Sequence, residues 1–197
     1  MYLGYFSNDL AKGEIENLCA SVLQLCASSI EDKEHPIHVD LKAIESFSKP
    51  WSVPADPHVT TLFMGKRAPT DPKKLKIFES FEDGKKEEIT VHAVAYIPGG
   101  IATGITLCDR DRIAIDNDFD HMTLMTAGLA AKYSNDLLEA LFESDGHFAN
   151  HYADKLANIE CGKVYQAEVI VKGQKSTAFL VRLEKPWSFI ASSKRIY

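Results

Sequence analysis

Two short stretches of the chain combine a histidine, an apolar residue and a threonine in the same order. They are His58-Val59-Thr60 and His121-Met122-Thr123, each within an apolar run. Side chains alternate between the two faces of a β-strand. If these stretches are strands, each places its histidine and threonine on one face and its central apolar residue on the other. Each strand would then present an imidazole and a hydroxyl side by side.

These residue types suit acid–base chemistry on a small anion. Histidine titrates near neutral pH, so one imidazole can be neutral while a second is protonated. The neutral ring can take a proton from water, and the charged ring can give a proton to a leaving oxygen. If the strands face each other, His58 and His121 carry the protons. The hydroxyls of Thr60 and Thr123 then hold the oxygens of the anion. This chemistry requires no metal and no cofactor, and we expect neither.

Composition places the chain among ordinary globular proteins. It has 197 residues, of which 45% are hydrophobic and 25% are charged. This length is enough for one domain with an ample core or for two closely joined lobes. The net charge of −6 argues against a protein that coats long nucleic acid, because such a protein needs a basic face. It does not exclude recognition of a single phosphate or a nucleotide end.

We expect neither a membrane span nor secretion. No apolar run approaches the roughly 20 residues of a membrane helix, and the residues after Met1 lack the basic segment of a signal peptide. The four cysteines are widely spaced and form no C-x-x-C pair, which favours free thiols in a reducing compartment. The expected location is therefore the cytoplasm or the nucleus.

Apolar spacings of three and four predict three amphipathic helices. One ends near Ser28, and its apolar stripe includes Cys19 and Cys26. Burial explains these two thiols better than metal ligation does. A second helix begins at Pro72, and a third follows Ser134, which is a natural helix cap.

Alternating apolar residues predict strands in the rest of the chain. The clearest hairpin covers residues 89–108 and turns at residues 98–100, and a second covers residues 164–183. A tail follows over residues 187–197. Residues 31–52 are interrupted by prolines and show a weak strand-like alternation of Ile37, Val39 and Leu41.

Two other patterns suggest a site less specifically than the paired motifs. Residues 99–104 have the G-x-x-x-x-G outline of a phosphate loop, but Ile105 stands where a lysine must reach the phosphates. His147 and His151 lie one helical turn apart and would suit a metal, but no further ligand has convincing spacing. We interpret these segments as parts of a hairpin and of a surface helix.

The paired motifs, with a strand, a helix and a hairpin repeated in that order, resemble the two-histidine phosphoesterase superfamily. The run from Lys132 to Leu138 is similar to the cyclic phosphodiesterase domain of fungal-type tRNA ligases. The resemblance implies an α+β fold with two pseudo-symmetric lobes, each an antiparallel sheet with outer helices, around a central cleft. It also implies one domain over residues 1–197, with both motifs facing the cleft.

The same resemblance implies a cyclic phosphodiesterase. Such an enzyme hydrolyses the 2′,3′-cyclic phosphate of an RNA end or a nucleotide to a 2′-phosphate and a 3′-hydroxyl. The catalytic residues would be His58 and His121, and Thr60 and Thr123 would bind the substrate. Which histidine is the acid and which the base stays open.

Two alternatives to this function remain open at the level of sequence. One is a 2′,5′-phosphodiesterase acting on oligoadenylates, which uses the same motif pair. The other is a non-catalytic module that binds phosphorylated RNA ends. The expected partners are RNA 3′ ends or small cyclic nucleotides as substrate, with no DNA and no membrane, and the expected state is a monomer.

Overall fold

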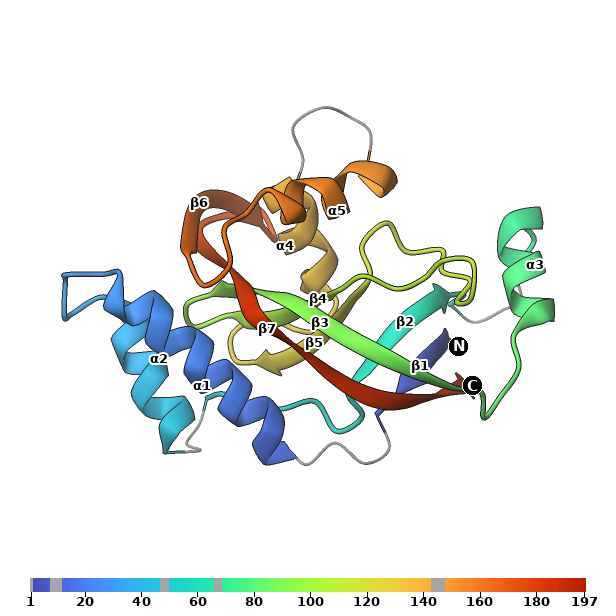
Figure 1. The fold of residues 1–197 in the computed structure, drawn as a ribbon, viewed down its shortest axis with the longest axis horizontal. Helices are drawn as coiled ribbons and strands as arrows, with labels where there is room; N and C mark the ends of the chain where they lie inside the picture. Colours follow the sequence, from blue (N-terminus) through green and yellow to red (C-terminus); the bar gives the residue numbers. More distant parts are fainter. Residues whose placement is uncertain (1, 8–11, 47–49, 66–68, 143–147) are drawn as a thin grey trace.

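Seven strands and five helices make up the described part of this chain, which covers residues 2–7, 12–46, 50–65, 69–142 and 148–197 of a computed structural model (Figure 1). In chain order the elements are β1 (Tyr2–Phe6), α1 (Lys12–Ser28), α2 (Pro36–Glu45), β2 (His58–Phe63), α3 (Pro72–Ser80), β3 (Lys86–Ile97), β4 (Ile101–Thr106), β5 (His121–Thr126), α4 (Tyr133–Phe142), α5 (Phe148–Ala157), β6 (Val164–Val171) and β7 (Gln174–Ile196).

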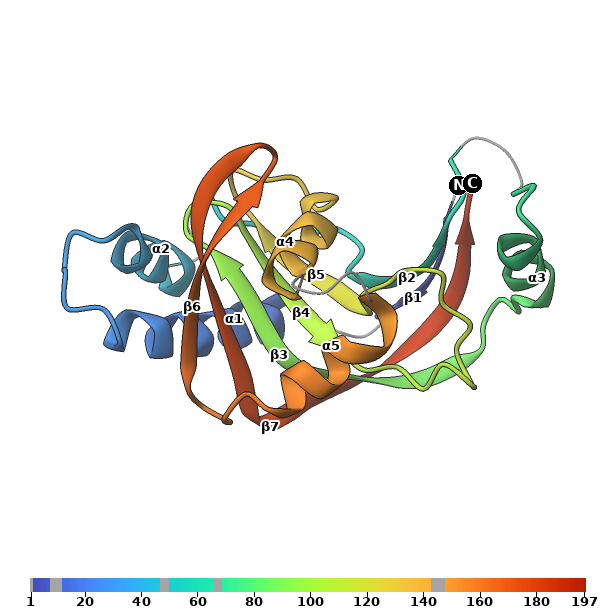
Figure 2. The ribbon, with the colours of Figure 1, turned by 90° about the horizontal axis from the view of Figure 1, so that it is seen from above.

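The strands form one antiparallel sheet in the order β1-β2-β5-β4-β3-β7-β6. β1 also pairs with β7, with Tyr2 opposite Ile196, so the sheet closes on itself and the two ends of the chain lie together (Figure 2). The expected α+β class is confirmed. The two motif strands belong to a single sheet rather than to two separate ones, because the long strands β3 and β7 pair with each other through both halves.

The sheet bends where β3 and β7 change register. Val91 pairs with Trp187 and Ala93 pairs with Arg182, so residues 183–186 of β7 stand opposite His92 alone. Extra residues of this kind bend a strand and increase its twist. The bend curves β3 and β7, as Figure 2 shows, and allows the ring of strands to close. The predicted tail is therefore the second half of β7, whose backbone pairs with β1 and β3.

Helices cover both faces of the part of the sheet around β3. α1 and α2 pack on one face, in a core that includes Val94 and Tyr96 of β3. α4 and α5 pack on the other face, over Ala93 and Ala95. Because β3 is buried on both sides here, its apolar run is continuous rather than alternating. α3 lies at the other end of the molecule, against β2 (Figure 1).

Residues 36–45 form the helix α2, so the strand-like pattern in this segment is wrong. Pro36 occupies the start of the helix, where its missing N–H needs no partner. Val39, which the alternation placed with the buried residues, is 65% exposed. Burial of a helical stripe therefore overrides the weak alternation. The buried apolar positions follow spacings of four and three: Ile37, Leu41 and Ile44.

The three predicted helices are present as α1, α3 and α4. Cys19 and Cys26 are buried on α1, as predicted, and burial raises the pKa of each thiol to about 12. Ser134 differs from its predicted role. α4 begins at Tyr133, and Ser134 lies inside its first turn with a buried side chain that contacts neighbouring strands.

Both predicted hairpins are present as well. The β3–β4 turn has Gly99 at a φ of 65°, and the β6–β7 turn has Gly173 at a φ of 71°. These positive angles suit glycine, which has no Cβ atom. His147 lies outside the described residues, so the interpretation of His147 and His151 stays a prediction. None of the helices in the described ranges has the length and apolar character needed to cross a membrane.

Candidate active site

The two motif strands are neighbours in the sheet. β2 and β5 run antiparallel and pair through Val59 and Met122. Both of these side chains are fully buried in the core on the α1 side. The motif histidines and threonines flank this pair and point to the opposite face. Extending the antiparallel register by one residue places each histidine across from the threonine of the other motif.

A cavity of about 500 Å³ lies on this opposite face. Its lining includes all four side chains that the sequence singles out, which are His58, Thr60, His121 and Thr123. It also includes polar and aromatic residues from outside the motifs: Tyr2, Asp56, Phe63, Asn117, Lys132 and Asn135. The structure therefore brings both motifs to one site, with a volume suited to a small ligand.

The imidazole of His58 is held by its own backbone segment and by aromatic rings. Its Nδ1 lies 2.7 Å from the carbonyl oxygen of Asp56. Because a carbonyl only accepts, Nδ1 carries the hydrogen, and the neutral ring has its lone pair on Nε2. The ring stacks against Tyr2 and Phe6, with centroid distances of 5.0 and 4.7 Å. Gly4 lets β1 lie close to β2 beside this ring, since a Cβ atom there would lie 2.8 Å from the carbonyl oxygen of Val59.

His121 is held in the same way in the second motif. Its Nδ1 lies 2.9 Å from the carbonyl oxygen of Phe119, again two residues earlier in the chain. The residue is only 9% exposed. Because the two bonds match, both neutral imidazoles have the same tautomer and offer Nε2 to a molecule in the cavity. An available ring nitrogen is what a general base or a general acid requires.

Burial makes both imidazoles harder to protonate. Loss of contact with water lowers the pKa of His58 and of His121 below the usual histidine value, and the carbonyl bonds oppose this only in part. The carboxylate of Asp56 also raises the pKa of His58 somewhat, whereas repulsion from His58 lowers the pKa of His121 further. The two rings therefore sense each other's charge, and the pair resists holding two protons at once.

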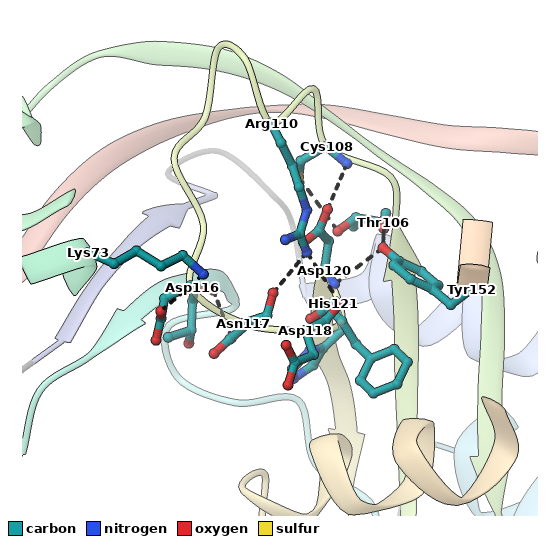
Figure 3. Close-up of polar contacts among 12 residues, drawn as sticks. Lys73, Thr106, Cys108, Arg110, Asp116, Asn117, Asp118, Asp120, His121 and Tyr152 are labelled. Carbon is teal, nitrogen blue, oxygen red and sulfur yellow. Dashed lines mark hydrogen bonds and ion pairs between the residues drawn. The ribbon is translucent and has the colours of Figure 1, made fainter. Parts of the chain in front are cut away.

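An ion pair between the exposed Arg110 and the buried Asp120 holds the loop that leads into His121 (Figure 3). Nη2 of Arg110 donates to Oδ1 of Asp120 at 2.6 Å, and the Asp120 side chain is only 2% exposed. The same nitrogen donates to two carbonyl oxygens of the loop, at 2.8 and 3.3 Å. The other carboxylate oxygen accepts from the N–H of Cys108 at 3.2 Å. These bonds close the loop and steady the backbone that orients the imidazole.

Asn117 joins this loop to the first motif. Its Nδ2 donates to the backbone carbonyl of Thr60 at 2.9 Å. The neighbouring N–H of Asp116 donates to the next carbonyl of β2 at 2.7 Å. The Asp116 carboxylate also pairs with Lys73 and Lys74 of α3 (Figure 3 shows the pair with Lys73). The loop thus spans from β5 to β2, and the amide of Asn117 lines the cavity between them.

The two threonine hydroxyls have different surroundings. Oγ1 of Thr123 lies 2.8 Å from Oγ of Ser134, and it donates to the carbonyl oxygen of Ala131 over 3.5 Å. Within the described residues, the hydroxyl of Thr60 has no hydrogen-bond partner. Two motifs with the same sequence pattern therefore differ in how firmly they hold their hydroxyls.

Two residues that line the cavity come from segments without a regular pattern. Lys132 precedes α4 and Asn117 lies in the loop before β5, whereas Asn135 lies in the first turn of α4. Periodicity predicts nothing about such segments, so the one sequence signal for Lys132 is the run that carries the family resemblance. Its ammonium and the N-terminal end of α4 both add positive potential at the cavity. This potential offsets the negative charge of Asp56, which also lines the cavity.

The groups that line the cavity are suited to proton transfer and to hydrogen bonding. They include imidazoles, hydroxyls, side-chain amides, a carboxylate and an ammonium group. Across the residues that the structure describes, no three His, Cys, Asp or Glu side chains gather as a set that could hold a metal ion.

Comparison with known proteins relates this chain to solved structures but not to known sequences. No protein-family model and no curated protein sequence matches it. A structure described as "Crystal Structure of Fungal RNA Kinase" superimposes on 98% of this chain, with a TM-score of 0.54 and 12% sequence identity. The two chains share a fold. The match covers 44% of the kinase chain, so this chain spans less than half of the length of the kinase. At 12% identity, the similarity shows a shared fold alone.

Proposed function

We propose that this protein is a metal-independent cyclic phosphodiesterase that hydrolyses the 2′,3′-cyclic phosphates of RNA ends or of nucleotides. The observation that carries this proposal is the convergence of both His-x-Thr motifs on one cavity, each imidazole with Nε2 available. An acid and a base that face the same small volume can act together on one bound phosphate.

The reaction takes one proton and gives one proton in the same step. The neutral imidazole accepts a proton through Nε2 from the water whose oxygen attacks phosphorus. The bond between phosphorus and O3′ breaks, and the protonated imidazole gives its proton to O3′. The products are a 2′-phosphate and a 3′-hydroxyl, as the resemblance to the two-histidine phosphoesterases implies. The two imidazoles have then exchanged protonation states, and exchange with water restores them.

Other groups in the cavity stabilise the charge on the phosphate. In this proposal the hydroxyls of Thr60 and Thr123 donate to the non-bridging oxygens as phosphorus becomes five-coordinate. Lys132 lines the same cavity and supplies a positive charge. The N-terminal end of α4 adds its dipole. These groups neutralise the anion where the chemistry takes place, which is the task that a metal ion performs in other phosphoesterases.

Aromatic side chains make the cavity suitable for a nucleoside. Tyr2 and Phe63 are direct partners across β1 and β2, so their side chains share a face. Both line the cavity, and Phe63 is 66% exposed. Unstacked bases bind readily to aromatic faces of this kind. The proposed substrate therefore carries its cyclic phosphate on a nucleoside rather than on a simple alcohol.

Replacing Phe63 with alanine should raise the KM for adenosine 2′,3′-cyclic phosphate by about 5- to 150-fold, because base–aromatic stacking contributes about 1–3 kcal/mol per base. The value of kcat should change much less, since stacking acts equally on the ground state and the transition state. Val39 supplies a matched control, because it is an apolar side chain on α2 with 65% exposure. An unchanged KM for Phe63→Ala, or an equal effect of Val39→Ala, would argue against a base at this position.

Phosphorus NMR of a dinucleotide ending in a 2′,3′-cyclic phosphate tests the proposed function directly. We expect the cyclic resonance to be replaced by that of a 2′-phosphate monoester. A 3′-phosphate product would overturn the proposed bond cleavage. Binding without turnover would indicate a module that holds RNA ends. If a 2′,5′-linked oligoadenylate is hydrolysed preferentially in competition with the cyclic phosphate, the protein is a 2′,5′-phosphodiesterase instead.

Removal of metal ions should leave this activity unchanged. The proposed chemistry moves protons through His58 and His121 and balances the phosphate charge with protein groups, so no step passes through a metal. We expect the same kcat in excess EDTA as in untreated protein, and no increase when zinc is added. A rate that falls on chelation and returns with zinc would indicate a metallohydrolase.

A further inference from the structure

Three hydroxyl groups form a chain that ends in the cavity. Oγ of Ser134 lies 2.8 Å from Oγ1 of Thr103 and also 2.8 Å from Oγ1 of Thr123. Both distances are typical of well-formed O–H···O bonds. Thr103 and Ser134 are 0% exposed, whereas Thr123 is half-buried and lines the cavity. These three hydroxyl groups therefore connect the protein interior to the proposed phosphate site.

Three separate elements supply these hydroxyls. Thr103 of β4 and Thr123 of β5 are direct partners in the sheet, so their side chains lie on the same face. Ser134 comes from the first turn of α4, which contacts β4. Serine near the start of a helix commonly bonds to the backbone of that helix. Here its hydroxyl bridges two strands instead.

The hydrogens in this chain follow one direction. Each hydroxyl has a single hydrogen to donate. Thr123 donates to the carbonyl oxygen of Ala131, an atom that can only accept. With this donation the oxygen of Thr123 accepts the hydrogen of Ser134, which is one of the two directions that their 2.8 Å contact allows. Ser134 has then used its own hydrogen, so its oxygen accepts from Thr103. The donation runs from the interior towards the cavity.

We propose that Ser134 and Thr103 are positioning residues that direct the hydroxyl hydrogen of Thr123 towards the bound phosphate. The bond from Thr123 to Ala131 is long at 3.5 Å and therefore weak. Ala131 itself lines the cavity, so a phosphate oxygen there can take over as the acceptor. The hydrogen bonds from Thr103 to Ser134 and from Ser134 to Thr123 stay in place during this exchange. The inference rests on the proposed function, because it assumes that Thr123 holds the phosphate.

The first motif provides an internal comparison. Its threonine, Thr60, has no hydroxyl partner within the described residues and must find its orientation when the phosphate binds. Thr123 is oriented before binding, so less reorganisation is needed at the moment of reaction. Ser134 should therefore act through Thr123 and not through Thr60.

Removal of either buried hydroxyl should lower kcat without a large change in KM. Ser134→Ala and Thr103→Val each delete one hydroxyl while keeping a similar shape. We expect kcat for a 2′,3′-cyclic nucleotide to fall about fivefold in each, the effect of one ordinary hydrogen bond. KM should stay within about twofold, since the ground-state contacts remain. Thr103→Ser keeps the hydroxyl and should keep kcat.

A double-mutant cycle separates positioning from general structural damage. In a Thr123→Val background there is no hydroxyl to direct, so Ser134→Ala should change kcat by less than about 1.5-fold. In a Thr60→Val background the same substitution should keep its full effect of about fivefold. Equal losses in both backgrounds would overturn the inference, and so would an unchanged kcat for both Ser134→Ala and Thr103→Val in otherwise wild-type protein.

The affinity for adenosine 2′-phosphate supplies a second reading that does not depend on turnover. A 2′-phosphate monoester carries about two negative charges at neutral pH, which is closer to the charge of the five-coordinate transition state than the single charge of the cyclic substrate. The same cycle, measured by titration calorimetry, should therefore show weaker binding of the monoester for Ser134→Ala in the wild type and in the Thr60→Val background, but not in the Thr123→Val background. If the wild-type protein shows no turnover, the proposed function is wrong. The binding measurements would still test whether Ser134 acts through Thr123. Equal binding losses in all three backgrounds would reject it. Thermal unfolding checks that each variant is folded.

Discussion

Substitution of His58 or His121 by alanine should lower kcat/KM for a 2′,3′-cyclic nucleotide by about a hundredfold or more, the largest loss expected from any single change in this chain. The reaction takes and gives a proton in one step, so neither imidazole can replace the other. Both rings have Nδ1 bonded to a backbone carbonyl and Nε2 available, and both line the same cavity. Steady-state kinetics measures the loss.

His92 is the matched control for this experiment. It is a half-buried histidine of β3 whose pKa is also lowered by burial, but it does not line the cavity. His92→Ala should therefore keep most of the activity. Circular dichroism should show that all three variants are folded. If His58→Ala or His121→Ala retains nearly full activity, that residue is not a proton carrier and the proposed mechanism is wrong.

A plot of kcat/KM against pH should be bell-shaped, with its maximum on the acid side of about pH 6.5, the ordinary pKa of histidine. The active form has one proton shared by the pair. At low pH both rings are charged, and at high pH both are neutral, so the rate falls about tenfold per pH unit on each side. Burial lowers the pKa of both His58 and His121, so both limbs move to lower pH than for free histidine.

Two comparisons sharpen the test of this profile. The carboxylate of Asp56 raises the pKa of His58, so Asp56→Asn should move the profile to still lower pH. The profile of kcat alone should lie at higher pH than that of kcat/KM, because a bound anionic phosphate favours the protonated imidazole. A rate that rises steadily into the alkaline range would indicate hydroxide or a metal-bound water as the nucleophile.

Local patterns accounted for most of the secondary structure. The helix that buries Cys19 and Cys26 and the hairpin around Gly99 follow from apolar spacing and turn residues, which act over a few neighbouring positions. The same reasoning failed at α2, where Val39 is exposed and helical burial prevails. It also missed the second half of β7, because that strand exists through pairing with β1 and β3, which are far away in the chain.

The sequence by itself determined which groups are available for chemistry at the site. Alternation along a strand is a local property, so it placed His58 with Thr60 and His121 with Thr123 without reference to the rest of the chain. The apolar residue between each pair, Val59 or Met122, is buried in the core as this alternation requires. The same local property explains why both motifs present their polar side chains together.

Only the tertiary structure decided how these groups meet and which others join them. The pairing of β2 with β5 brings the two motifs to one cavity, and carbonyl contacts set the same tautomer in both rings. Ser134, a helix cap by its local pattern, instead bridges Thr103 and Thr123. Lys132 and Asn117 enter from segments without periodicity. Each of these contacts involves residues that are distant in sequence or that lie in irregular segments. The free energy that selects these contacts comes from packing the whole sheet, and a local sequence pattern carries no information about that packing.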